Sequence, residues 1–229
     1  MGLFNRSIQV SASGLLDGRT DWHCHILPGV DDGFKRMEDS LAALARYEQV
    51  GFREVWLTPH IMEDIPNTTA SLRQRFTDLQ VAYNGKLRLH LASENMMDQL
   101  FTERLEAMDL LPLSNKRLLV ETSYFNPPYD MDGILASVKS RGFFPLLAHP
   151  ERYMYMDFRR YEALKADGIE FQLNISSLIG SYGPEAQSKA TKLLDAGMYD
   201  YSGTDLHRLS SLEHLLEARL GKKTLKLIP

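Results

Sequence analysis

Short apolar runs alternate with helical patterns seven times along this chain. The segments that we interpret as strands are 20–25, 54–58, 87–94, 118–122, 144–148, 170–174 and 199–202. The predicted helices between and after them are 37–50, 69–83, 97–108, 131–141, 158–167, 184–196 and 211–220. Strands joined by crossover helices build a parallel sheet. Seven such units predict one α/β domain over residues 19–229, closed or nearly closed into a barrel, after a lead-in segment of residues 1–18.

Residues with metal-ligand chemistry stand at the ends of these strands. Five of the seven histidines occur there together with four carboxylates, and the full set is His23, His25, Asp32, His60, Glu94, Glu121, His149, Asp205 and His207. The active site of such barrels forms where the strands end. His23 and His25 are two residues apart on a strand, so both rings project from the same face. The set exceeds what one cation needs and predicts two or three metal ions.

The donor types narrow the choice of metal. Imidazole mixed with carboxylate suits manganese, iron or zinc better than calcium. Paired cations about 3.5–4 Å apart are typical of phosphate-ester hydrolysis, because they clamp the attacking and leaving oxygens. Taken singly, each residue also has a structural interpretation: a carboxylate at an exposed strand end, or Asp205 as a helix cap. The repeated occurrence at successive strand ends favours a shared site.

Composition excludes several classes of protein. The net charge of −4 argues against a nucleic-acid partner, since phosphate-backbone binding usually needs clustered cations. No apolar run approaches the roughly 18 residues needed to cross a bilayer. The single cysteine, Cys24, fits a reducing cytoplasm. Cys24 also lacks the arginine six residues later that a cysteine-dependent phosphatase needs, because that position is Val30.

Six short stretches of the sequence, taken in chain order, resemble those of one known group of enzymes. They are residues 21–33 (DWHCHILPGVDDG), 58–60 (TPH), 93–94 (SE), 120–121 (VE), 148–153 (AHPERY) and 203–207 (GTDLH). The chain is similar to the polymerase and histidinol phosphatase (PHP) superfamily. Within it, the chain most resembles the manganese-dependent protein-tyrosine phosphatases of bacterial capsule and exopolysaccharide synthesis.

This resemblance implies a distorted (β/α)7 TIM-like barrel of the PHP type that holds three divalent metal ions. Mn2+ is favoured, with Fe, Zn or Mg as alternatives. The implied ligand sets are His23, His25, Glu94 and Asp205 for one ion; Glu94, Glu121 and His149 for a second; and Asp32, His60 and His207 for the third.

The resemblance also implies the residues that act on the substrate. Arg152 is expected to bind phosphate and to act in catalysis with Asp205 and His207, and Arg208 is a further candidate for substrate binding. A planar guanidinium suits phosphate recognition. One departure is Asn95, where relatives commonly carry an aromatic residue, so we expect a difference in substrate shape or efficiency.

The expected function is hydrolysis of phosphotyrosine on a protein by a metal-bound hydroxide. The resemblance implies a tyrosine autokinase of polysaccharide export as the partner, in the cytoplasm. Three alternatives stay open on the sequence: a small-molecule phosphatase such as a histidinol phosphatase, a metal-dependent amidohydrolase, and a non-catalytic metal-binding regulator.

Overall fold

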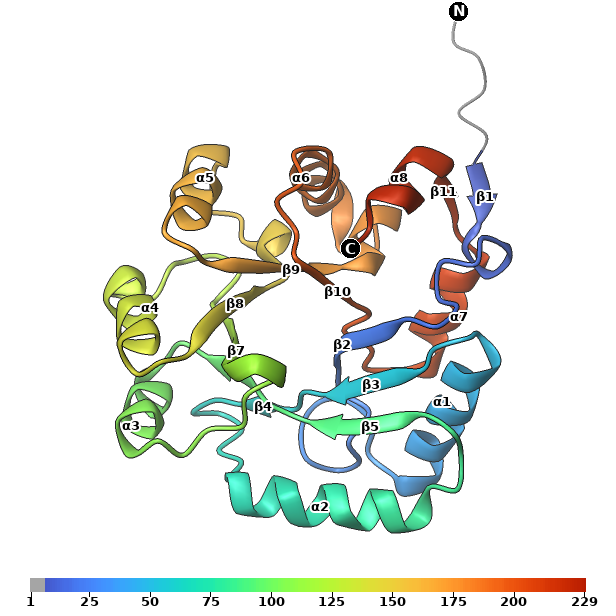
Figure 1. The fold of residues 1–229 in the computed structure, drawn as a ribbon, viewed down its shortest axis with the longest axis horizontal. Coiled ribbons are helices and arrows are strands. Elements are labelled where there is room, and N and C mark those ends of the chain that lie inside the picture. The colour runs from blue at the N-terminus through green and yellow to red at the C-terminus, as the bar shows by residue number, and fades with distance from the viewer. Residues whose placement is uncertain (1–6) are drawn as a thin grey trace, which may run out of the picture.

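Two parallel sheets form the centre of the molecule, which the computed structural model describes over residues 7–229 (Figure 1). The larger sheet has six strands in the order β10 (Tyr201–Gly203), β9 (Glu170–Asn174), β8 (Phe144–Ala148), β7 (Arg117–Glu121), β6 (Glu94–Met96) and β4 (His60–Ile61). The smaller sheet has three, in the order β2 (Thr20–Cys24), β3 (Glu54–Leu57) and β5 (Arg88–Leu91). The alternation of strands and helices therefore predicts the parallel pairing correctly.

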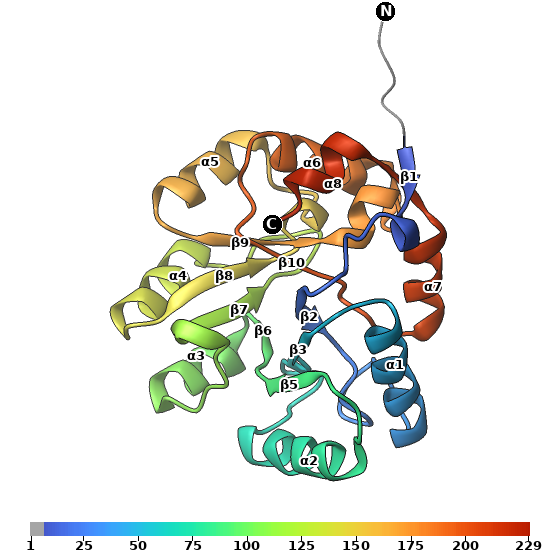
Figure 2. The same cartoon turned by 45° about the vertical axis from the view of Figure 1, so that its right-hand side comes forward.

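Helices follow the strands and lie around the outside of both sheets (Figures 1 and 2). They are α1 (Met37–Gln49), α2 (Thr69–Ala82), α3 (Gln99–Ala107), α4 (Met131–Ser140), α5 (Phe158–Ala166), α6 (Gly183–Asp195), α7 (Leu209–Glu217) and α8 (Lys222–Leu227). Side chains of a strand alternate between its two faces. On β7, Leu118 and Val120 accordingly join the main core, while Leu119 joins a small second cluster that includes Leu146.

The single α/β domain with a curled parallel sheet is confirmed, but the seven predicted strands do not close into a full barrel. The six-stranded sheet is a curled half-barrel, and the other three strands form a separate sheet. The predicted strand 87–94 is in fact two strands, β5 and β6, which belong to different sheets and are separated at Ala92 and Ser93. Between β3 and β4 stands Pro59, which has no amide hydrogen to donate to a ladder.

The two sheets still meet between β2 and the segment after β10. The backbone N–H of Asp205 donates to the oxygen of His23 at 2.8 Å, and the N–H of His25 donates to the oxygen of Leu206 at 3.0 Å. An isolated parallel bridge joins Cys24 and Leu206. These contacts bring the first and last strand ends together without closing the barrel.

The two ends of the described chain pack against each other. β1 (Ser7–Gln9) pairs antiparallel with β11 (Arg219–Gly221), and the sequence patterns predict neither strand. Val10, Leu15 and Leu16 of the predicted lead-in are buried. Residues 1–6 lie outside the described residues, and the domain boundary at residue 18 stays a prediction. Within residues 7–229, no helix has both the length and the apolar character to cross a membrane.

Candidate metal centre

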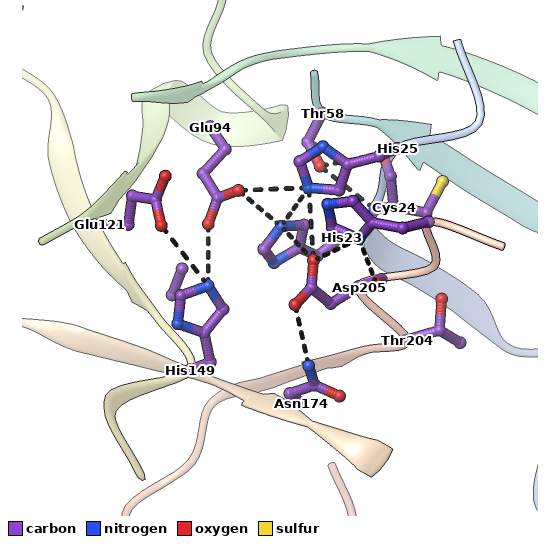
Figure 3. Close-up of polar contacts among 12 residues, drawn as sticks. His23, Cys24, His25, Thr58, Glu94, Glu121, His149, Asn174, Thr204 and Asp205 are labelled. Carbon is purple, nitrogen blue, oxygen red and sulfur yellow. Dashed lines mark hydrogen bonds and ion pairs between the residues drawn. The ribbon is translucent and has the colours of Figure 1, made fainter. Parts of the chain in front are cut away.

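The structure brings the nine predicted metal-ligand residues into one cluster. Figure 3 labels part of it: His23, His25, Glu94, Glu121, His149 and Asp205. Glu94, at the start of β6, lies in the middle. Its Oε2 is 3.1 Å from His23 Nε2, 3.2 Å from His25 Nε2 and 3.2 Å from His60 Nδ1. Its Oε1 is 3.0 Å from His149 Nε2. One carboxylate therefore faces four imidazole rings from three different strands or strand ends, those of β2, β4 and β8.

Three groups within this cluster have the arrangement of a metal site, with one ligand atom from each residue and all atoms within 4.8 Å of one another. They are His23, His25, Glu94 and Asp205; His60, Glu94 and Glu121; and His25, Asp32, His60 and His207. The first group equals one implied ligand set. The other two differ from the implied sets: His60 also lies beside Glu94 and Glu121, and His25 beside Asp32 and His207.

Buried atoms without a hydrogen-bond partner fit a cation at this place. In residues 7–229, four of the five such side-chain atoms belong to the cluster: His60 Nδ1, His149 Nδ1, Glu94 Oε2 and Glu121 Oε1. A buried polar atom without a partner is costly, so native proteins rarely keep one unless something else binds it. The donor set of imidazoles and carboxylates is the one that divalent transition metals prefer.

Neighbouring residues fix the orientation of the first two histidines. His23 Nδ1 donates to Gln172 Oε1 at 2.9 Å, and His25 Nδ1 donates to Asp31 Oδ2 at 2.8 Å. Both rings thus present Nε2 to the cluster, and such partners also raise the basicity of a metal-binding histidine. Gly33 allows this turn, because a Cβ there would lie 2.1 Å from the backbone oxygen of His25.

Two cluster residues have a strained backbone. His149 and Asp205 have φ values of 32° and 51°, a left-handed region that residues other than glycine seldom adopt. Such strain persists only where the surroundings hold it, and it concentrates at functional sites. Around Asp205, Thr204 donates through N–H and hydroxyl to the buried carboxylate of Asp21, at 2.9 and 2.6 Å. This bond ties the loop after β10 back to β2.

Arg152 lies beside the cluster, between two aromatic rings. Its guanidinium carbon is 4.3 Å from the ring centre of Tyr124 and 4.1 Å from that of Tyr182, and its Nη1 donates to Asp205 Oδ2 at 2.8 Å. Asn174 Nδ2 donates to the same oxygen at 3.0 Å and to the Tyr182 hydroxyl at 3.0 Å. The predicted phosphate-binding arginine is therefore held on both faces and along one edge.

A cavity of about 320 Å³ opens above these residues. Its wall includes Asp32, His60, Arg152, His207 and Arg208. His207 Nδ1 donates to the backbone oxygen of Asp205 at 2.9 Å, while its Nε2 lies 3.2 Å from Asp32 Oδ1. Arg208 is exposed at the cavity wall. Ligand atoms and cationic side chains thus share one opening of a size that suits a phosphorylated side chain.

The position of Asn95 does not support the expected effect of this residue on the substrate. Asn95 is buried on the other face of β6 from Glu94, where its Nδ2 donates to the backbone oxygens of Ser93 and Leu119 at 3.0 and 2.9 Å. Its Oδ1 accepts from Arg104 Nη1 at 3.1 Å. Asn95 therefore serves a buried polar network beneath α3 rather than the cavity.

Sequence reasoning missed Gln172, Tyr124 and Tyr182. Gln172 stands between the apolar residues Phe171 and Leu173 in the middle of β9, and a polar residue at such a position is a signal of a buried hydrogen bond. Tyr124 and Tyr182 lie in loops, where periodicity carries no information. Cys24, predicted to point away from the histidines, does so: its Sγ contacts the backbone oxygen of Trp56 at 3.5 Å (Figure 3).

Comparison with known proteins shows the family to which the chain belongs. The model of the family described as "Capsular polysaccharide synthesis, CpsB/CapC" matches residues 19–220. The chain belongs to the CpsB/CapC family. Among its relatives are the tyrosine-protein phosphatase YwqE of Bacillus subtilis, 26% identical over 83% of this chain and 78% of YwqE, and the tyrosine-protein phosphatase CpsB of Streptococcus agalactiae, 26% identical over 82% of this chain and 83% of CpsB.

One solved structure agrees with this membership of the CpsB/CapC family, and a second shares only the fold. One comes from work on YwqE of Bacillus subtilis and CpsB of Streptococcus pneumoniae, described as unique metal-dependent tyrosine phosphatases. It superimposes with a TM-score of 0.77 at 25% identity and covers 91% of this chain and 90% of its own. The phosphotriesterase homology protein of Escherichia coli, with a TM-score of 0.55 at 11% identity and coverage of 93% and 96%, shares the fold.

The carboxylates and imidazoles of this CpsB/CapC-family centre shift one another's pKa values. Burial lowers the pKa of His23, but Glu94 and Asp205 outweigh it and raise that pKa to about 9. Burial raises the pKa of Glu94, yet His23 and His60 hold it well below its ordinary value. Without metal, the imidazole of His23 is therefore protonated at neutral pH and held by the carboxylates of Glu94 and Asp205.

Metal binding should consequently depend on pH. A cation needs neutral imidazole, so binding below pH 9 must displace the proton of His23. We expect the apparent affinity for Mn2+ to rise at least about tenfold per pH unit between roughly pH 7 and 8.5, since the pKa of His25 is raised as well. Competition with a chelator of known pH dependence measures this. An affinity that stays constant over the range would contradict protonated ligands in the metal-free protein.

Proposed function

We propose that this CpsB/CapC-family protein is a metal-dependent protein-tyrosine phosphatase of capsular polysaccharide synthesis. The observation that carries the proposal is a cluster of imidazoles and carboxylates in which four buried atoms make no hydrogen bond within residues 7–229, next to an arginine in the same cavity. Cations and a guanidinium at one opening are what phosphoryl transfer requires. The names of the relatives YwqE and CpsB support the choice of phosphotyrosine.

The ligand assignment is part of this proposal. We assign His23, His25, Glu94 and Asp205 to one ion, with Glu94 shared by a second ion beside Glu121 and His149. His60 and Asp32 lie with His207 around a third position. Mn2+ is favoured, with Fe, Zn or Mg as alternatives. Support for the first and third sets comes from groups of ligand atoms within 4.8 Å of one another. Support for the second is that His149 Nε2 lies 3.0 Å from Glu94 Oε1 and 3.9 Å from Glu121 Oε2.

Bound cations supply an activated water and neutralise charge on the phosphoryl oxygens. Residues of the chain bind and orient the phosphoryl group. Arg152 uses one of its N–H groups on Asp205, which leaves the remaining donors of the fork for phosphoryl oxygens. Asp205 holds that fork, His207 borders the same cavity, and Arg208 adds positive charge at its wall. The leaving phenol has a pKa of about 10, so protonation of the leaving group is less demanding than for an alkoxide.

The partner and the location extend the proposal. We infer a phosphorylated tyrosine autokinase of polysaccharide export as the substrate protein, met in the cytoplasm. The family description of capsular polysaccharide synthesis supports the pathway, and the one free, buried cysteine is compatible with a reducing compartment.

A comparison of substrates tests the proposal. With Mn2+ added, the protein should hydrolyse a phosphotyrosine peptide at least about 100-fold more efficiently than histidinol phosphate, because the phenolate is the better leaving group. Released phosphate is measured for both at several concentrations. A preference for histidinol phosphate would favour a small-molecule phosphatase. Bound metal without hydrolysis of either compound would favour a metal-binding regulator.

A further inference from the structure

A second cavity adjoins the metal cavity and shares a wall with it. It measures about 400 Å³, and the shared wall consists of Tyr124, Arg152 and Tyr182. Since the guanidinium of Arg152 lies between the two tyrosine rings, the wall is a stack of flat groups rather than a flexible loop tip. When a phosphorylated side chain of a substrate reaches the metal cavity, the neighbouring residues of that substrate therefore lie at the entrance of the side cavity.

The side cavity is mainly apolar in its contact surface. Met154, Pro184 and Ala186 contribute to its lining. The ammonium group of Lys189 is already paired: its Nζ donates to the backbone oxygen of Tyr153 at 2.7 Å and forms an ion pair with Glu185 at 3.3 Å. Arg152 is likewise paired with Asp205 at 2.8 Å. The cavity thus offers apolar area without a free charge of either sign.

Exposed apolar side chains concentrate in the three segments that contribute to the side cavity, and two of these side chains, Met154 and Tyr182, line it directly. Of the nine large hydrophobic residues that are exposed within residues 7–229, five lie in the segments that follow β7, β8 and β9: Phe125, Tyr129, Met154, Phe158 and Tyr182. We call these five residues the apolar rim. Two of the segments are joined by the N–H of Met154, which donates to the backbone oxygen of Tyr124 at 2.8 Å. Exposed aromatic and methionine side chains grouped in this way mark protein-binding surfaces.

We propose that the side cavity and the apolar rim bind an extended segment of the substrate protein, with an apolar side chain next to the phosphotyrosine seated in the side cavity. The inference rests on the proposed function, since it places the phosphotyrosine in the metal cavity. It adds a rule for substrate choice: apolar neighbours of the phosphotyrosine are favoured over acidic ones.

Binding of two peptides to the manganese-loaded protein tests this inference without turnover. Each peptide carries phosphonomethyl-phenylalanine, whose methylene group replaces the ester oxygen and prevents hydrolysis; one has leucines beside it and the other aspartates. We expect the leucine peptide to bind about tenfold more tightly. In Met154→Gln, which loses apolar surface without adding charge, the ratio should fall below about threefold, whereas Met154→Leu should keep it.

Met108→Gln is the matched control. Met154 and Met108 are both 54% exposed, but Met108 follows α3, away from the side cavity. It should keep the tenfold ratio, and melting temperatures show that each variant folds. A ratio near one in the parent, or an unchanged ratio in Met154→Gln, overturns the inference. So does sedimentation that shows a dimer of the parent which Met154→Gln dissociates, because a second copy then covers the rim. Failure of the proposed function would show separately, as absent phosphotyrosine hydrolysis by the parent.

Discussion

Replacing Glu94 with glutamine should lower the rate of phosphotyrosine hydrolysis at least about 1000-fold. The side chain keeps its size, but it loses the charge that faces His23, His25 and His60 at 3.1 to 3.2 Å. In the proposed assignment this carboxylate joins two ions, so the variant weakens both. Loss of about 4 kcal/mol of metal-derived stabilisation of the transition state corresponds to that factor. Initial rates on a phosphotyrosine peptide with saturating Mn2+ measure it.

Two further measurements make the Glu94→Gln result specific. Glu106→Gln, an exposed glutamate on the neighbouring helix α3, should retain full activity. Elemental analysis after gel filtration should show less bound metal in Glu94→Gln than in the parent, while circular dichroism shows the same fold. If Glu94→Gln hydrolyses the peptide as fast as the parent, the Glu94 carboxylate is not needed for catalysis despite its central position.

Arg152→Lys should reduce kcat/KM for the phosphotyrosine peptide about 100-fold. Lysine keeps the positive charge, but it has neither the planar fork that binds two phosphoryl oxygens nor the flat faces that lie 4.3 and 4.1 Å from Tyr124 and Tyr182. The loss of one aligned donor from a preorganised site typically costs a factor of about 100 to 1000. Steady-state kinetics with the peptide give the ratio.

Arg159→Lys provides the control for that exchange. Arg159 is exposed on α5, so its replacement should leave kcat/KM unchanged. Arg208→Lys should have a smaller effect than Arg152→Lys, because Arg208 is exposed at the wall of the cavity and Arg152 is held on both faces. Equal activity of Arg152→Lys and the parent would remove Arg152 from phosphate binding.

The strand-end residues were the most predictable part of the molecule. His23 and His25 share a face because a strand repeats every two residues, and parallel strands place their ends at one edge. These two rules suffice to group Glu94, Glu121 and His149 with them, without knowledge of the exact sheet order. The structure places all of them in one cluster.

The sheet break and the residues around the ligands were not predictable in this way. Leu87, Leu89 and Leu91 alternate smoothly toward Glu94, so the pattern predicts one strand, whereas the backbone leaves one sheet and enters another at Ala92. Tertiary contacts decide such a break. Tyr124 and Tyr182 acquire their role only when two loops meet at Arg152, and no local pattern records that meeting.

Anomalous scattering at the manganese absorption edge tests the central claim most directly. Crystals would be grown with Mn2+ and soaked with inorganic phosphate. We predict anomalous peaks among His23, His25, Glu94, His149 and Asp205 and their neighbours in the cluster, with phosphate between the metals and Arg152. Crystals without metal in this cluster, of a protein that hydrolyses phosphotyrosine under the same conditions, would contradict the account.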